Sequence, residues 1–166
     1  FEAPSDPRRL ADWKWHPLCK AGWIMSLVAS DMDDDGDLDV LFSDRKGQST
    51  GCFWLEHPDA PGNSNAPWRK HPIGGVGKEV MFLTQADLDG DGLIDVIVAT
   101  RPKEILYLRR RDRGGRNWES HSISLPSDTG ESKAVNVGNI NLDGKLDIVL
   151  TCEGATPPRS GVVWLS

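Results

Sequence analysis

An acidic loop occurs three times in this sequence, at residues 31–39, 87–95 and 139–147, and each copy fits the pattern D/N-x-D/N-x-D-G-x-x-D. The copies read DMDDDGDLD, DLDGDGLID and NINLDGKLD. Oxygen side chains at positions 1, 3, 5 and 9 can converge on one hard cation, while the glycine at position 6 permits a sharp turn. The backbone carbonyl of position 7 adds a further ligand. The pattern therefore predicts calcium-binding loops.

The predicted ligands follow from these positions, with position 7 contributing its backbone carbonyl. They are Asp31, Asp33, Asp35, Asp37 and Asp39 in the first loop, Asp87, Asp89, Asp91, Leu93 and Asp95 in the second, and Asn139, Asn141, Asp143, Lys145 and Asp147 in the third. Asp-Gly pairs also form hairpin turns without a metal. Carboxylates crowded into nine residues repel one another unless a cation is bound, which favours two occupied sites in the first two loops. We expect a weaker or empty third site, where Asn139 and Asn141 replace carboxylates and Lys145 adds a positive charge.

The residues that follow each loop separate it from an EF-hand. An EF-hand needs a bidentate Glu at position 12 and a helix on either side. Position 12 is Phe42, Val98 and Leu150 in the three copies, so the twelfth ligand is absent each time. Because the flanking segments are short runs of Val, Ile and Leu, we expect each loop to join two strands of a hairpin.

Two further motifs recur in step with the loops. W-x-x-H occurs at residues 13–16, 68–71 and 118–121, and an aromatic third segment follows each loop at residues 52–55, 105–108 and 162–165. The first strands are expected at residues 24–29, 80–85 and 134–137, and the second at residues 40–42, 96–99 and 148–150. One repeat is then four short antiparallel strands, with W-x-x-H on the fourth. Four strands in a repeat of roughly 50 residues predict the blade of a β-propeller.

These motifs resemble a known family. The loop that runs directly into Leu-Asp-Val, Ile-Asp-Val or Leu-Asp-Ile is similar to FG-GAP/VCBS repeats, which are calcium-loop propeller blades of the kind found in integrin α-chains. The W-x-x-H motif together with Trp-Leu-Glu-His-Pro at residues 54–58 looks like the bacterial and fungal type attached to carbohydrate-active proteins. The resemblance covers almost the whole chain and implies calcium binding. Asn139 and Asn141 depart from the strongest form of the loop.

The repeats divide the chain into one β-propeller segment. Repeat 1 covers residues 19–73, repeat 2 residues 74–123, and repeat 3 residues 124–166 without its fourth strand, while residues 1–18 supply a stray fourth strand. Three blades cannot close a ring, because propellers typically need about four to eight. We therefore expect either further propeller blades, seven in all by the family resemblance, or a head-to-tail ring with a second copy of the chain.

Composition narrows the protein class. At 166 residues the chain is long enough for one domain, and it has no apolar run long enough for a transmembrane helix. The net charge is −6, and three divalent ions would bring it close to zero. No signal peptide is visible, and the chain opens abruptly, as expected of a trimmed or excised polypeptide. Calcium loops of moderate affinity favour an extracellular, periplasmic or cell-surface location.

The three cysteines cannot all pair with one another. Cys19, Cys52 and Cys152 show no C-x-x-C spacing, and two of them fall in expected strands. Since free cysteine is among the most buried residue types, we expect buried structural thiols.

The expected topology places the metal loops and the loops between third and fourth strands at one end of the blades. The opposite end, where such folds usually bind ligands, carries a basic residue from each repeat. The candidate ligand-face residues are Arg45, Lys46, Lys78, Glu79, Arg101, Lys103, Lys133, Glu153 and Arg159. Forked Arg donors suit an acidic glycan or sugar hydroxyls. For any single residue, a solvated loop tip is the simpler interpretation.

The remaining aromatic and basic residues indicate structure before chemistry. Trp54, Tyr107 and Trp164 recur at one position of the repeat and His16, His71 and His121 at another, as packing between blades requires. His57 has no repeat equivalent and no partner visible in the sequence. The basic run at residues 109–116 lies in one hairpin loop of a net acidic chain, so we expect no nucleic-acid binding.

Catalytic motifs are missing from the sequence: it has no G-x-S-x-G, no H-E-x-x-H and no phosphate-binding glycine loop. We therefore predict no catalytic residues and a calcium-stabilised binding or scaffold module, with carbohydrate as the expected ligand. One alternative is the propeller part of a sugar-active lyase or dehydratase. The other is a protein-interaction platform of the integrin kind.

Overall fold

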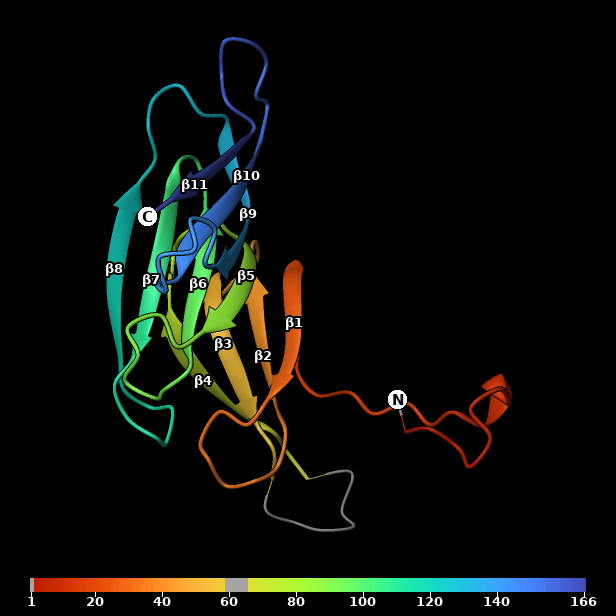
Figure 1. Cartoon of the computed structure of the whole chain (residues 1–166). Helices are drawn as coiled ribbons and strands as arrows, with labels where there is room; N and C mark the ends of the chain where they lie inside the picture. Colours follow the sequence, from red (N-terminus) through yellow and green to blue (C-terminus); the bar gives the residue numbers. More distant parts are fainter. Residues whose placement is uncertain (1, 59–65) are drawn as a thin grey trace.

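The computed structural model describes residues 2–58 and 66–166, and the regular structure of these residues is eleven strands and one short 3-10 helix, Leu10–Asp12 (Figure 1). The strands are β1 (Ile24–Ser30), β2 (Asp39–Asp44), β3 (Gly51–Glu56), β4 (Arg69–Gly74), β5 (Val80–Ala86), β6 (Asp95–Thr100), β7 (Glu104–Arg110), β8 (Trp118–Ser124), β9 (Glu131–Gly138), β10 (Asp147–Glu153) and β11 (Val162–Leu165). The predicted all-β class is confirmed. None of the helical residues described forms a segment of the length and apolarity that a membrane crossing requires.

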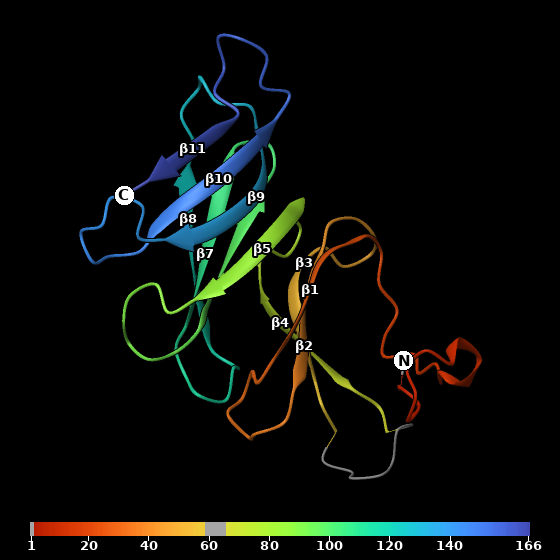
Figure 2. The same ribbon diagram turned by 45° about the vertical axis from the view of Figure 1, so that its right-hand side comes forward.

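The strands form repeated units of the predicted order. One sheet runs β1-β2-β3-β4, and a larger one runs β11-β10-β9-β5-β6-β7-β8, in which a single parallel pairing, Phe82 with Ala134, joins β5 to β9. All other strand pairs are antiparallel. The first strands of successive units lie beside one another: the Leu83 N–H on β5 donates to Ser26 Oγ on β1 at 3.0 Å (Figure 2). The arrangement is that of β-propeller-like blades.

Apart from the stray N-terminal strand, the predicted strands lie within or beside the observed ones, and several observed strands are longer. β9 begins at Glu131, three residues before the predicted start, because Glu131 pairs with Glu153 at the far end of β10. Backbone pairing with β10 thus extends β9 beyond the apolar segment from which the strand was predicted.

The predicted stray fourth strand is not formed. Residues 13–18 lie in no strand, and Lys14 makes a single bridge to Glu2 in an N-terminal segment that projects from the sheets (Figure 1). β11, in turn, is the last strand of its sheet, so its outer edge has no partner strand among the described residues. A strand needs a partner strand for its backbone N–H and C=O groups. The partner expected for a W-x-x-H strand is the outer edge of a third strand such as β11, and residues 13–18 lie away from it (Figure 1).

Two apolar clusters fill the spaces between units. Trp54 of the first unit and Val98 and Leu106 of the second belong to one cluster, while Ile97 of the second and Leu150 of the third belong to the other. All five side chains are buried. The second repeat therefore buries one face against the first and the other against the third, as expected of stacked blades.

In the first two units the recurring aromatic and histidine side chains pack against each other within a unit, whereas the sequence analysis expected packing between blades. The Trp54 and His71 rings lie 4.6 Å apart across β3 and β4, and the Tyr107 and His121 rings lie 5.6 Å apart across β7 and β8. Both contacts join the third strand of a unit to its fourth.

The cysteines differ in burial. Cys52 is buried, which raises the pKa of its thiol to about 12, and Cys152 is partly buried. Cys19 is exposed, so the expectation of a buried thiol is wrong at this residue, which lies in the projecting N-terminal segment. All three are free thiols.

Candidate metal centres

The three acidic loops join the first and second strands of their units, as predicted, and share an unusual backbone. The glycine at position 6 has a positive φ in every copy: 96° at Gly36, 85° at Gly92 and 90° at Gly144. Position 4 is also left-handed, and there the second copy has Gly90, whereas the first and third have Asp34 (φ 61°) and Leu142 (φ 63°). The loop therefore requires two left-handed residues, of which the sequence pattern revealed only one.

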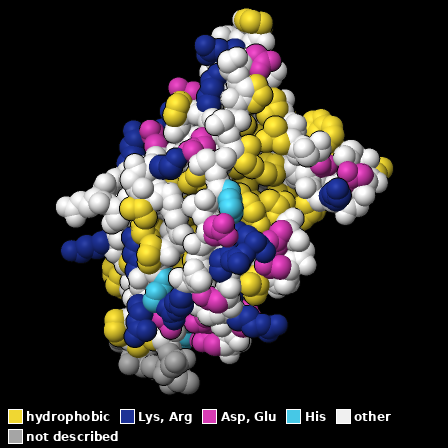
Figure 3. All heavy atoms as spheres, turned by 90° about the vertical axis from the view of Figure 1, so that its left-hand side faces the viewer, with side chains coloured by type: hydrophobic (Ala, Val, Ile, Leu, Met, Phe, Trp, Pro, Cys, Tyr) yellow, Lys and Arg dark blue, Asp and Glu magenta, His cyan; other side chains and the backbone are white. Residues whose placement is uncertain are grey.

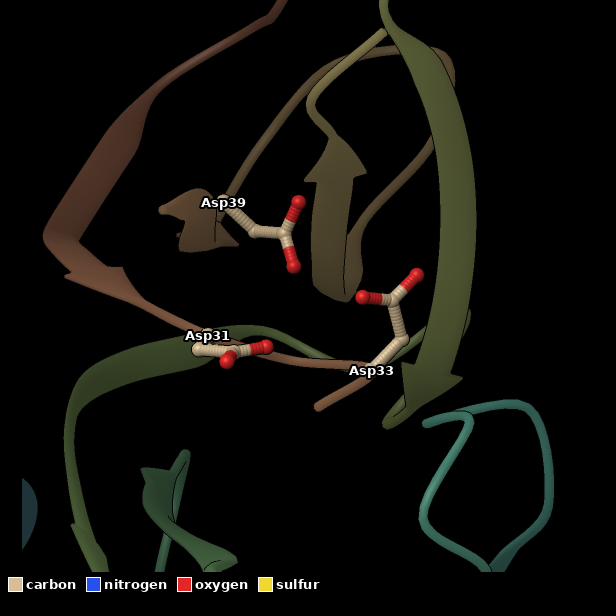
Figure 4. A group of neighbouring side chains, drawn as sticks. All are labelled: Asp31, Asp33 and Asp39. Atoms are coloured by element: carbon tan, nitrogen blue, oxygen red, sulfur yellow. The ribbon is translucent and has the colours of Figure 1, made fainter. Parts of the chain in front are cut away.

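The first loop brings three carboxylates together. Asp31, Asp33 and Asp39 each offer an oxygen, and these oxygens lie within 4.8 Å of one another (Figure 4). Oδ1 of Asp31, of Asp33 and of Asp37 is buried without a hydrogen-bond partner. Buried polar atoms are almost always satisfied, so these orphaned oxygens need a ligand. An oxygen-preferring divalent cation such as Ca²⁺ fits this set.

Electrostatics in the first loop favour the same ligand. Burial, followed by the neighbouring Asp35, Asp39 and Glu56 carboxylates, raises the pKa of Asp33 to about 6. The carboxylates thus repel one another, and a bound divalent cation would reverse the sign of that interaction.

The carboxylate at position 9 also has a structural role that the sequence pattern did not reveal. Asp39 is buried and accepts the N–H of Met32 at 2.8 Å and of His57 at 2.7 Å. Asp95 likewise accepts the N–H of Leu88 at 3.1 Å and of Arg110 at 2.9 Å. This side chain ties the loop to the end of the third strand, and burial raises the pKa of both Asp39 and Asp95.

The second loop forms a comparable group from Asp87, Asp89 and Asp95. Asp87 accepts the backbone N–H groups of residues 90, 91 and 92 at 2.8, 3.0 and 2.9 Å, which fixes the turn. A basic side chain from β7 also reaches this loop: Arg109 pairs with Asp89 and Asp91. The Leu93 N–H, followed by Arg109, lowers the pKa of Asp91.

The third loop has fewer charges. Asn139 Oδ1 is buried without a hydrogen-bond partner, whereas Asn141 and Asp143 hydrogen-bond to each other at 3.1 Å. Among the described residues, the groups of three or more converging acidic, His or Cys side chains are those of the first two loops. The remaining predicted ligands, Asp35, Asp91 and the position-7 residues Asp37, Leu93 and Lys145, lie in the same turns but outside those two groups.

The loop between β7 and β8 (residues 111–117) covers the first metal loop, which the sequence did not predict. Trp54 Nε1 donates to the Gly115 carbonyl at 3.1 Å. Arg116 lies over the Trp54 ring, donates to Glu56 at 2.9 Å and lies 3.8 Å from Asp33. These contacts join the second unit to the first. They also confirm that the metal loops and the third-to-fourth-strand loops share one end of the blades.

His57 has partners that its sequence context did not reveal. Its Nδ1 lies 3.1 Å from Asp37 Oδ2, and its ring meets Trp68 edge-on at 4.8 Å. The side chain therefore packs beside the first metal loop.

Most candidate ligand-face residues pair with carboxylates instead of standing free. Arg45 reaches Glu79 of the next unit at 2.5 Å, and Arg101 reaches Glu131 of the next at 3.2 Å. An Arg of one unit thus forms an ion pair with a Glu of the next unit both between the first and second units and between the second and third. Further pairs on this end are Lys78–Glu104, Lys133–Glu153 and Arg101–Glu153.

Three of these residues have other partners. Lys46 lies over the Trp23 ring at 5.5 Å, Lys103 Nζ donates to the Ser127 carbonyl at 2.8 Å, and the Arg159 N–H donates to the Thr156 carbonyl. Figure 3 shows the same interleaving of charge on another face, where basic side chains lie beside acidic ones. Arg45 and Arg101 therefore tie neighbouring units together, while Lys78 and Lys133 pair within their own units.

The comparison with known families agrees with this geometry. Residues 87–150 match the FG-GAP-like repeat family, and the matched segment runs from the start of the second acidic loop to the strand that follows the third. No curated protein sequence matches the chain.

Proposed function

Because the chain carries an FG-GAP-like repeat at residues 87–150, we propose that it is a calcium-binding, β-propeller-type module that holds a ligand-binding scaffold in shape. The observation that carries this proposal is the first loop, where Asp31, Asp33 and Asp39 converge and three buried oxygens lack a partner. Calcium in the extracellular, periplasmic or cell-surface environment, at millimolar concentration, would fill a site of even modest affinity.

The role of the ion follows from the connections of its ligands. Asp31 directly follows the first strand, Asp39 begins the second, and the Asp39 carboxylate also accepts the His57 N–H just after the third. An ion held by these carboxylates would therefore lock three strands of one unit. When bound, the ion would supply positive charge for the oxygen ligands of the loop, and no redox chemistry.

Thermal unfolding in calcium and in chelator tests the proposal. A ligand that binds only the folded state stabilises it by RT ln(1 + [L]/Kd), or about 2.7 kcal/mol at one hundred times Kd. We expect calcium to raise the Tm by several degrees, and Asp33→Asn and Asp89→Asn each to remove part of the rise. Asp128→Asn, outside the loops, is the matched control. An equal Tm with and without calcium would exclude the proposed role.

We also propose that further blades or a second copy supply the strand that β11 lacks. In the first two units an aromatic residue on the third strand meets the His of W-x-x-H on the fourth. Trp164 holds the corresponding position on β11 and is 48% exposed. The remaining copy of W-x-x-H, at residues 13–16 near the N-terminus, lies outside every strand. By the register of β3 with β4, Trp164 would face the His of the incoming strand.

Cross-linking distinguishes the sources of this strand. In a Cys19→Ser background, chains carrying His16→Cys are mixed with chains carrying Trp164→Cys under oxidising conditions, and Ser5→Cys in place of His16→Cys is the control. A specific heterodimer supports a second copy as the donor. A monomeric mass by light scattering without that product supports strands from further blades.

A carbohydrate is the ligand that we propose for the end opposite the metal loops. There a cavity of about 310 Å³ is lined by Lys20, Asp44 and Gln48, among others. Trp23 directly follows Gly22, which lines the cavity, and is 52% exposed. The Arg45 guanidinium lies over its ring, 5.0 Å from the ring centroid. An exposed aromatic face beside polar donors and acceptors suits a sugar ring.

Tryptophan fluorescence with neutral and acidic oligosaccharides tests this site. Binding should be lost in Trp23→Ala and kept in Trp15→Ala, because Trp15 is exposed in the N-terminal segment. New ultraviolet absorbance from an acidic polysaccharide would instead support a lyase. Tight protein partners without any sugar effect would support an interaction platform.

A further inference from the structure

The second acidic loop contains a positively charged side chain among its carboxylates. Arg109, near the end of β7, places Nε 2.5 Å from Asp89 Oδ2 and Nη2 3.1 Å from Asp91 Oδ2. Its side chain is 29% exposed, so water screens these contacts only in part. The guanidinium thus already neutralises two of the carboxylates that would face an ion in this loop.

The first loop has the opposite charge at the equivalent place. In the strand registers, Val40 pairs with Leu55 and Val96 with Leu108, so the next residues, Glu56 and Arg109, are equivalent. The buried Asp of each loop confirms the alignment, because Asp39 and Asp95 accept the N–H of the residue that follows. Glu56 is a carboxylate, and it lies close enough to raise the pKa of Asp33.

We propose that Arg109 is a tethered cation that competes with calcium for the second loop, so that the two loops bind calcium with different affinities. The inference rests on the proposed calcium function and assigns its order: the first loop fills at lower calcium concentration. An ion entering the second loop must displace the guanidinium from Asp89 and Asp91. In the first loop, Arg110 and Arg113 reach only Asp34 at position 4, at 3.5 and 3.9 Å, and His57 lies beside Asp37, the expected ligand through its backbone carbonyl. Arg116, the basic residue nearest to Asp33, lies 3.8 Å from it and pairs more closely with Glu56, at 2.9 Å.

The expected size follows from ion-pair energetics. A partly exposed ion pair, made here with two carboxylates, changes an equilibrium by a factor on the order of ten. Removing the Arg109 charge should therefore tighten calcium binding at the second loop about tenfold. It should leave the first loop unchanged, because Arg109 contacts none of its residues.

Calcium titration calorimetry on the full chain tests this. Asp33→Asn, which disables the first loop, is the background in which the remaining transition reports the second. Arg109→Gln is compared there with Arg111→Gln as the matched control, because Arg111 pairs with Glu119 and only its longer-range charge acts on Asp91. Arg109→Lys, which keeps a positive charge, serves as a further variant if Arg109→Gln folds poorly. We expect tighter binding in Arg109→Gln, an affinity close to the parent in Arg109→Lys, and a much smaller change in Arg111→Gln than in Arg109→Gln.

Thermal unfolding with and without calcium tests the role of Arg109 independently of calorimetry. Without calcium, Arg109→Gln should unfold at lower temperature than the parent, since Asp89 and Asp91 lose their counter-charge. With calcium it should gain more stability than the parent does.

The outcomes separate the two proposals. Calcium binding at both loops with Arg109→Gln identical to its parent would overturn the competitor role and leave the calcium function standing. An Arg109→Lys variant that binds as tightly as Arg109→Gln would overturn it as well. No calcium binding in the wild-type chain would overturn both.

Discussion

At position 4 of the acidic loops, single residues adopt a backbone that suits glycine. The second loop has Gly90 there, while Asp34 and Leu142 adopt the same left-handed conformation with side chains. Left-handed backbone costs an L-residue about 1–2 kcal/mol, although Asp tolerates it better than Leu because its short side chain can bond locally. The third loop, which has the weakest set of ligands, thus also holds the least suited residue.

Leu142→Gly should therefore stabilise the protein. The Leu142 side chain is 85% exposed, so little packing is lost, and we expect a gain of about 1 kcal/mol in the free energy of unfolding. Urea denaturation measures the change. Leu146→Gly in the same loop, where φ is not positive, is the matched control and should destabilise. An equal loss in the free energy of unfolding in the two variants would contradict backbone strain at Leu142.

The carboxylate cluster of the first loop predicts a dependence on pH. The pKa of Asp33 rises from 3.8 to about 6 on folding, so the folded state binds the proton more tightly than the unfolded state. The stabilisation is present in full below pH 3.8 and is lost as the pH rises through 6. Without calcium, the free energy of unfolding should thus fall over this interval, by at most about 3 kcal/mol.

Urea denaturation in calcium-free buffer at pH 4, 5, 6 and 7 measures this fall, and Asp33→Asn should reduce it. Calcium affinity should change in the opposite sense. Because the ion binds the ionised carboxylate, affinity at the first loop should weaken as the pH drops below about 6. A wild-type profile that coincides with that of Asp33→Asn would contradict the assignment to Asp33.

At the scale of elements, the sequence was most informative where it repeats. The strands and loops were predictable because the acidic pattern and W-x-x-H fix the phase of each repeat. Arg109 and the β7–β8 loop were not, because their partners lie in other elements: Arg109 meets Asp89, and Gly115 meets Trp54 from 61 residues away. Local patterns carry no information on such pairings. A signal did exist in the repeat alignment, where Glu56 and Arg109 differ in charge.

The close fit of the β7–β8 loop on the first unit can be tested at one glycine. A Cβ at Gly115 would lie 2.2 Å from the Met32 carbonyl oxygen, and its φ is +62°. Gly115→Ala should therefore displace the loop from the first metal loop and cost about 2 kcal/mol or more.

Gly114→Ala is the matched control for that experiment. A Cβ there meets nothing closer than 3.8 Å, so its effect should stay within about 0.5 kcal/mol. Calcium affinity at the first loop should also fall in Gly115→Ala alone. Equal stability of the two variants would show that the loop does not seat against Met32.

At the scale of the whole molecule, the net charge favours bound calcium, and the contacts between units show how the repeats are held together. The chain has a net charge of −6, and two calcium ions would offset four of these charges. Its units are joined by apolar clusters and by the Arg-to-Glu pairs at each junction. The ring expected from the sequence depends on contacts outside this chain or between copies of it, and no local pattern in one sequence specifies them.

Native mass spectrometry of the chain in calcium tests the central claim most directly, because it counts bound ions on the folded protein. We expect two calcium ions per wild-type chain at saturation, one in Asp33→Asn and one in Asp89→Asn. A wild-type chain with no bound calcium, or variants that retain the wild-type count, would contradict the account.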